Sequence, residues 1–152
     1  MPPIKRYQDS YCHRLAVEIR REVLRLTRRE NVRRDFRFVS QIRDSARGAP
    51  RNIAEGHSRF NPTEILPFLS YAKASSDETG NHVADALESG YFSRQEAETL
   101  QTKLSKLISA LLNWMKYLES PAARRFYEQH RARRRAGTQS TENQPNPRTP
   151  EP

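Results

Sequence analysis

Four histidines and one cysteine are the side chains of this sequence most suited to nucleophilic catalysis or metal binding. Cys12 and His13 are adjacent, so on a helix their side chains point about 100° apart and are poorly placed to act as a nucleophile and its base. We therefore interpret Cys12 as a buried residue and His13 as a surface residue. The remaining histidines, His57, His82 and His130, complete no known catalytic arrangement.

A possible metal site is formed by Glu78, His82 and Asp85, whose spacings of four and three place them on one helical face. Di-iron bundles use Glu-x-x-His motifs on two helices together with carboxylates from two more. Only one such set occurs here, so we expect a solvated face rather than a metal site. The sequence also contains no Gly-rich phosphate loop and no Gly-x-Ser-x-Gly elbow. We predict no catalytic residue, no cofactor and no metal, and hence a protein that is not an enzyme.

Helical periodicity dominates the sequence from about residue 9 to residue 118. Apolar residues recur at spacings of three and four over about residues 9–30, 35–56, 61–89 and 93–118. Asn61-Pro62-Thr63-Glu64 and Ser93-Arg94-Gln95-Glu96 are typical helix starts. In the second segment the expected core positions include Phe36, Val39 and Ile42, and Pro50 predicts a kink. The pattern predicts an all-α, antiparallel up-down-up-down four-helix bundle over residues 9–119.

The two ends of the chain differ from this central region. Residues 1–8 are interpreted as an N-terminal arm, and residues 120–152 as a basic tail. Residues 122–136 could form a short Arg-rich helix, whereas the Pro-rich composition from about Gly137 predicts disorder. We find no apolar stretch of the ~20 residues needed to span a bilayer and no secretory signal. The single cysteine suits a reducing compartment, so a cytoplasmic location is expected.

Positive charge is concentrated in the first half of the bundle. Residues 1–59 carry 15 Lys/Arg and 7 Asp/Glu, whereas residues 60–119 carry 5 and 8. This excess favours anionic partners such as RNA or DNA, although a solvated face would show the same composition. The candidate nucleic-acid-binding residues are Arg14, Arg20, Arg21, Arg25, Arg28, Arg29, Arg33 and Arg34. Few aromatic residues lie among them, so we expect phosphate contacts without sequence readout of bases.

The segment Pro50-Arg51-Asn52-Ile53-Ala54-Glu55-Gly56 places Asn52, Glu55 and Arg59 on one helical face. One interpretation is structural: Asn52 and Glu55 satisfy backbone groups at the kink and the helix end, and Arg59 neutralises Glu55. The alternative is a contact with another subunit or a ligand.

Pro50-x-Asn52-Ile53-Ala54-Glu55-Gly56-x-x-Arg59 resembles the signature of bacterial four-helix bundle proteins encoded in intervening sequences of large-subunit ribosomal RNA genes. Pro67-Phe68-Leu69, the stretch 72–78 with Ser75 and Glu78, and Gly90-Tyr91 extend the resemblance over about residues 7–119. Lys73 and Ala74 depart from the Arg-Gly of the family pattern. By position, the family signature residues are Pro50, Asn52, Ile53, Ala54, Glu55, Gly56, Arg59, Ser75 and Glu78, with no assigned role.

The resemblance implies a ring-like homopentamer and kinship with the accessory variability proteins of diversity-generating retroelements. Those relatives form basic barrels that bind a reverse transcriptase and its nucleic acid. From the residues, the broad apolar surface of segment 93–118, which includes Ile108, Leu112 and Met115, exceeds the needs of one bundle core and predicts self-association. We therefore predict a nucleic-acid-associated oligomeric accessory protein; the alternative is a protein-interaction scaffold with no nucleic-acid role.

Overall fold

The structure, a computed structural model, describes residues 10–142. Every regular element in this range is a helix, which confirms the predicted all-α class. The helices are α1 (Tyr11–Leu26), α2 (Glu30–Arg33), α3 (Phe36–His57), α4 (Pro62–Glu88), α5 (Arg94–Leu118) and α6 (Pro121–Glu142).

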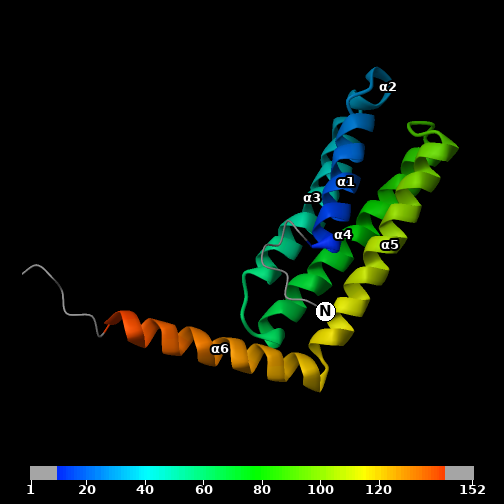
Figure 1. The fold of residues 1–152 in the computed structure, drawn as a ribbon. Coiled ribbons are helices and arrows are strands. Elements are labelled where there is room, and N and C mark those ends of the chain that lie inside the picture. The colour runs from blue at the N-terminus through cyan, green and yellow to red at the C-terminus, as the bar shows by residue number, and fades with distance from the viewer. Residues whose placement is uncertain (1–9, 143–152) are drawn as a thin grey trace, which may run out of the picture.

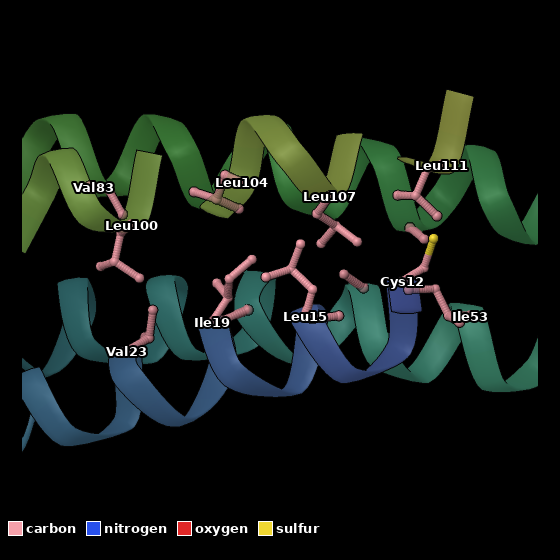
Figure 2. Close-up of a cluster of buried hydrophobic side chains, with 14 of the residues drawn as sticks. Cys12, Leu15, Ile19, Val23, Ile53, Val83, Leu100, Leu104, Leu107 and Leu111 are labelled. Atoms are coloured by element: carbon pink, nitrogen blue, oxygen red, sulfur yellow. The ribbon is translucent and has the colours of Figure 1, made fainter. Parts of the chain in front are cut away.

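Four long helices, α1, α3, α4 and α5, lie side by side, while α6 crosses one end of this group (Figure 1). α3 packs against α4, α4 against α5, and α1 against both α3 and α5. Leucines of α5 face Leu15, Ile19 and Val23 of α1 across a shared core (Figure 2). The buried side chains recur every three or four residues on each helix, so the predicted apolar seams do form the core.

The first helix is shorter than predicted. It ends at Leu26 rather than near residue 30, and the short helix α2 lies between the first two predicted segments. At this point the hydroxyl of Thr27 donates to the carbonyl of Val23 at 2.7 Å and accepts from Arg43 Nε at 2.8 Å. Thr27 is buried, so these bonds fix the chain where it leaves α1.

Phe36 was wrongly placed in the core, since its side chain is 82% exposed. Phe38 points inward instead and packs against Tyr91, with ring centroids 5.1 Å apart. Asp35 begins the helix by accepting from the Phe38 amide at 3.0 Å. Phe38 lies four residues before Ile42 and shares its helical face, whereas Phe36, six residues before Ile42, does not.

The contact between α3 and α4 is built from small residues. A β-carbon placed on Gly48 would lie 2.2 Å from Ser75 Oγ, which shows how closely the two backbones approach. One turn away, the buried hydroxyl of Thr79 donates to Ser45 Oγ at 3.1 Å. Small side chains therefore set the spacing of these two helices, and the two hydroxyls, which also bond the carbonyls of Ile42 and Ser75 on their own helices, link the pair.

A second feature joins the end of α1 to the start of α5. Ser93 and Glu96 form a capping box at the N-terminus of α5. The Glu96 carboxylate also receives two hydrogen bonds from Arg29, one of them 3.0 Å from Nη1 to Oε2. These bonds to the charged form hold the pKa of Glu96 at about 2.

α6 replaces much of the predicted tail. Its first turn is capped by Ser120, which accepts from the Ala123 amide at 3.2 Å, and Ala123 is buried. The helix includes residues 137–142, where composition had predicted disorder. An Arg-rich helix over 122–136 was predicted, but its continuation was not. The predicted arm at residues 1–8 and the rest of the predicted disordered tail, residues 143–152, lie outside the described residues.

Replacing Gly48 with alanine should destabilise the protein by about 1–3 kcal/mol, because the new β-carbon overlaps Ser75. This cost opposes the gain of up to ~1 kcal/mol that alanine brings to a helix. Gly80→Ala is the matched control, since its nearest neighbour is the flexible end of Gln101 at 3.3 Å. Urea unfolding should show a loss for Gly48→Ala, a near-neutral Gly80→Ala, and partial rescue of Gly48→Ala by Ser75→Gly. Equal stability of both alanine variants would contradict the close contact.

Glu96→Gln should lower stability near neutral pH by up to about 1 kcal/mol, because it removes the ion pair but keeps an oxygen for the capping box. The depressed pKa stabilises the fold above the unfolded-state value of about 4.5, and this stabilisation is lost as the pH falls toward 2. Unfolding measured from pH 7 to pH 2 should therefore show the difference between wild type and variant shrinking below about pH 4.5. A difference that stays constant down to pH 2 would exclude this role.

Candidate nucleic-acid interface

The exposed sides of α1, α2 and α3 form one surface, here called the basic face. On α1 the side chains of Arg14 and Arg21 are exposed, and Arg28, also exposed, lies in the turn that follows the helix. Arg14 and Arg21 lie two helical turns apart on the same side of α1, and with Arg28 they are here called the arginine stripe of α1. On α3 the exposed cations are Arg37, Arg47 and Arg51.

Half of the eight predicted binding arginines are paired with carboxylates. Arg25 bonds Glu22 through Nε at 2.9 Å. Arg33 and Arg34 both contact Glu30, the latter at 2.7 Å. Arg29 is bound to Glu96, as described above. These four cations already have a structural partner, so they contribute less available charge than the sequence suggested.

The other four predicted arginines, Arg14, Arg20, Arg21 and Arg28, form no ion pair within residues 10–142. Arg20 differs from the rest because it is only half-exposed, and its Nε is buried without a hydrogen-bond acceptor in the described chain. Sequence reasoning missed Arg37 and Arg51, which are also exposed and without an ion pair in that range. The helical pattern of α3 could have found them, because they lie opposite its buried positions.

Most of the family signature segment packs inside the protein. Pro50, Ile53 and Gly56 are buried. A β-carbon on Gly56 would lie 3.1 Å from Phe68 Cβ of α4, so this glycine also permits close helix contact. Asn52 Nδ2 donates to the carbonyl of Gly48 at 2.9 Å, as predicted for a backbone group near Pro50.

Glu55 and Arg59 form the predicted ion pair at the end of α3. The guanidinium of Arg59 also lies over the ring of Phe68, 5.1 Å from its centroid. The expectation that Glu55 would satisfy a backbone group was wrong, because Arg59 is its partner and Ser58 bonds the carbonyl of residue 55. Ser75 lies in the α3–α4 contact, whereas Glu78 is exposed and Ala54 is half-buried.

The side chains considered above for catalysis or metal binding are packed against other residues of the protein. Burial raises the pKa of the Cys12 thiol to about 11, so the thiolate is scarce at neutral pH. His82 packs edge-on against Phe38, and its ring nitrogens lie 3.8 Å from Glu78 Oε1 and from Asp85 Oδ2. Both distances are too long for hydrogen bonds. Within residues 10–142 no three His, Cys, Asp or Glu side chains are arranged to hold a metal ion.

The helices in the described part of the chain are too short or too polar to cross a membrane.

Comparison with known proteins identifies one family. A family model described as 23S rRNA-intervening sequence protein matches residues 8–113, which include α1 to α4 and most of α5. No curated protein matched the chain. The match covers well over half of the 152 residues and contains every signature residue from Pro50 to Glu78. This chain therefore belongs to the 23S rRNA-intervening sequence protein family, as the resemblance of its Asn-Ile-Ala-Glu-Gly segment had indicated.

Proposed function

We propose that this protein is a non-enzymatic, oligomeric accessory protein whose basic face contacts the phosphates of RNA or DNA. The observation that carries the proposal is the exposed stripe of Arg14, Arg21 and Arg28, which no carboxylate of residues 10–142 neutralises. Unpaired surface cations add little to folding stability, but they attract a polyanion. The family description, which refers to 23S rRNA, agrees with a nucleic-acid setting.

The proposed contact reads the phosphate backbone rather than the bases. Between Arg14 and Arg28 the chain has no aromatic residue, so bases have no stacking surface along this stretch; the exposed Tyr11 and Phe36 lie outside it. The charge separation supports this interpretation, because helices α4 and α5 belong to the acidic part of the chain. Affinity should therefore depend steeply on salt and weakly on sequence.

Self-association is the second part of the proposal. The protomer is an antiparallel up-down-up-down bundle of α1, α3, α4 and α5, and the resemblance to the family points to a homopentamer. Support comes from α5, where Leu112 is 46% exposed and Trp114 and Met115 are only partly buried. These side chains lie on α5, whereas the arginine stripe lies on α1 and in the turn after it, so different helices would carry assembly and nucleic-acid binding.

The alternative function is a scaffold for another protein, such as a reverse transcriptase, with no nucleic-acid role. The same apolar part of α5 favours it, because exposed apolar patches mark protein contacts. The two functions differ in whether the charge of α1 matters for binding.

Arg21→Glu combined with Arg28→Glu should weaken binding to a mixed-sequence RNA or DNA at least tenfold at about 100 mM salt. The variant should also reduce the slope of log affinity against log salt, since two phosphate contacts are lost. Fluorescence anisotropy measures both quantities. Lys106→Glu with Lys116→Glu on α5 is the matched control, because it changes the net charge equally at exposed positions. Equal losses in both variants would show a general charge effect, and no binding by wild type at low salt would refute the proposal.

Leu112→Glu should shift the protein toward the 17.7 kDa monomer without unfolding it, because the residue is half-exposed in the protomer. Burying a carboxylate in an apolar contact between subunits is costly. Light scattering gives the mass, and circular dichroism confirms that helicity is kept. Thr102→Glu, at another exposed position of α5, should leave the mass unchanged. A monomeric wild type in dilute buffer would contradict the proposed assembly.

A further inference from the structure

The last helix, α6, begins after the residues that match the family, since the match ends at residue 113 and α6 starts at Pro121. It crosses the end of the four-helix group instead of joining it and extends beyond it (Figure 1). The family fold therefore gives no account of why this chain carries a 22-residue helix here. We therefore infer the role of α6 from its buried and exposed side chains.

One side of α6, here called the resting line, packs against the rest of the protein. Ala123 is buried, and Tyr127 is half-buried against the core, so its pKa is raised by desolvation. Seven residues after Tyr127, the guanidinium of Arg134 lies 4.0 Å from the ring centroid of Phe60 in the α3–α4 loop. Spacings of four and seven place these three residues on the same side of the helix. The other sides of α6 are left open.

The open sides carry arginines on both flanks. Arg124, Arg131 and Arg135, at spacings of seven and four, lie along one flank, and Arg133 lies on the other. All four are exposed and form no ion pair within residues 10–142. Glu128, the one carboxylate among residues 121–136, lies beside the first flank, four residues after Arg124 and three before Arg131, so three cations and one carboxylate gather there. An occupant that meets all of these cations must reach both sides of the helix.

Between the two flanks, directly opposite the resting line, lie Arg125, Gln129, Ala132 and Ala136, at spacings of four, three and four. Because the side chains of the two alanines are short, a binding partner can approach the helix backbone closely along this outermost line. Arg125 and Gln129 are the two long polar side chains of the line. Arginine and glutamine are side chains that pair in bidentate fashion with guanine and adenine edges, respectively.

The arrangement of charged and small side chains on α6 fits some kinds of binding partner better than others. A membrane-surface helix needs a continuous apolar face on its exposed side, whereas the exposed side of α6 carries one large apolar side chain, Phe126. A flat protein surface that met the flank of Arg124, Arg131 and Arg135 would leave Arg133 unused. A groove with phosphates on both walls would contact the arginines of both flanks, and the short side chains of the outermost line would fit its floor.

We propose that α6 is a groove-binding helix for double-stranded nucleic acid, held by the bundle end and inserted between two phosphate walls. The major groove of B-form DNA, about 12 Å wide, admits a helix, whereas the A-form major groove is deep and too narrow for side-chain readout. The expected ligand is thus a B-form DNA duplex. This site is separate from the basic face and does not depend on the function proposed for it.

The test uses the full chain and fluorescence anisotropy with four probes: a DNA duplex, a regular RNA duplex, single-stranded DNA and polyglutamate. Arg124→Ala with Arg131→Ala and Arg135→Ala should weaken DNA-duplex binding at least tenfold at about 150 mM salt. The log–log salt slope should fall by about 2.7, the value for three lost phosphate contacts. Preference for the DNA duplex over the regular RNA duplex and the single strand is expected.

Ala132→Leu separates insertion from simple charge attraction, because it keeps the charge and the helix propensity but fills the low outermost line. It should weaken duplex binding at least fivefold, while Ala84→Leu, at an exposed position of α4, should have no effect. Unchanged binding by Ala132→Leu, or polyglutamate bound as tightly as DNA, would overturn the proposal. Loss of duplex binding in Arg21→Glu/Arg28→Glu alone, with the α6 variants unaffected, would assign all binding to the basic face instead.

Discussion

Gly48 of α3 lies so close to Ser75 of α4 that neither position has room for a larger side chain. Gly56 against Phe68 extends the same close contact toward the end of α3. With the two backbones this near, the hydroxyls of Ser45 and Thr79 can bond each other directly across the helix pair. The family signature, from Pro50 to Gly56, occupies the adjoining stretch of α3, so most of its residues are explained by packing rather than by chemistry.

The packing of α3 on α4 also determines which way the charges of α3 point. Its small residues face α4 and its apolar residues face α1 and the core, so Arg37 and Arg51 are left on the outside. α1 packs beside α3 and exposes its own arginines, Arg14 and Arg21, on the side away from its buried residues. The basic face is therefore a consequence of helix orientation. No loop or cavity is needed to form it, which suits a ligand recognised by its charge density.

The helices and most core positions could be predicted because three- and four-residue spacing identifies the buried face of each helix. Failures had different causes. At the end of α1, Thr27 bonds Arg43 of α3, a tertiary contact that the local pattern does not show. Phe36 was misplaced although the sequence itself favours Phe38, which lies four residues before Ile42 and shares its helical face. Among the predicted binding arginines, the pairing of Arg25 with a carboxylate three residues away could be anticipated. The pairing of Arg29 with Glu96, 67 residues away, could not, because it depends on how α1 and α5 are placed.

The same distinction separates the arginines that stabilise the fold from those that can serve a ligand. Arg29 bonds the carboxylate of Glu96 on α5, and Arg59 lies over the ring of Phe68 on α4. Replacing either arginine would therefore change contacts that hold the helices together. Arg14, Arg21 and Arg28, like Arg131 of α6, are exposed and unpaired among the described residues. Like charges held near one another on a surface repel, and without an anion they slightly oppose folding. A bound polyanion would relieve this repulsion, so ligand binding and stability should be linked at these surfaces and not at the paired arginines.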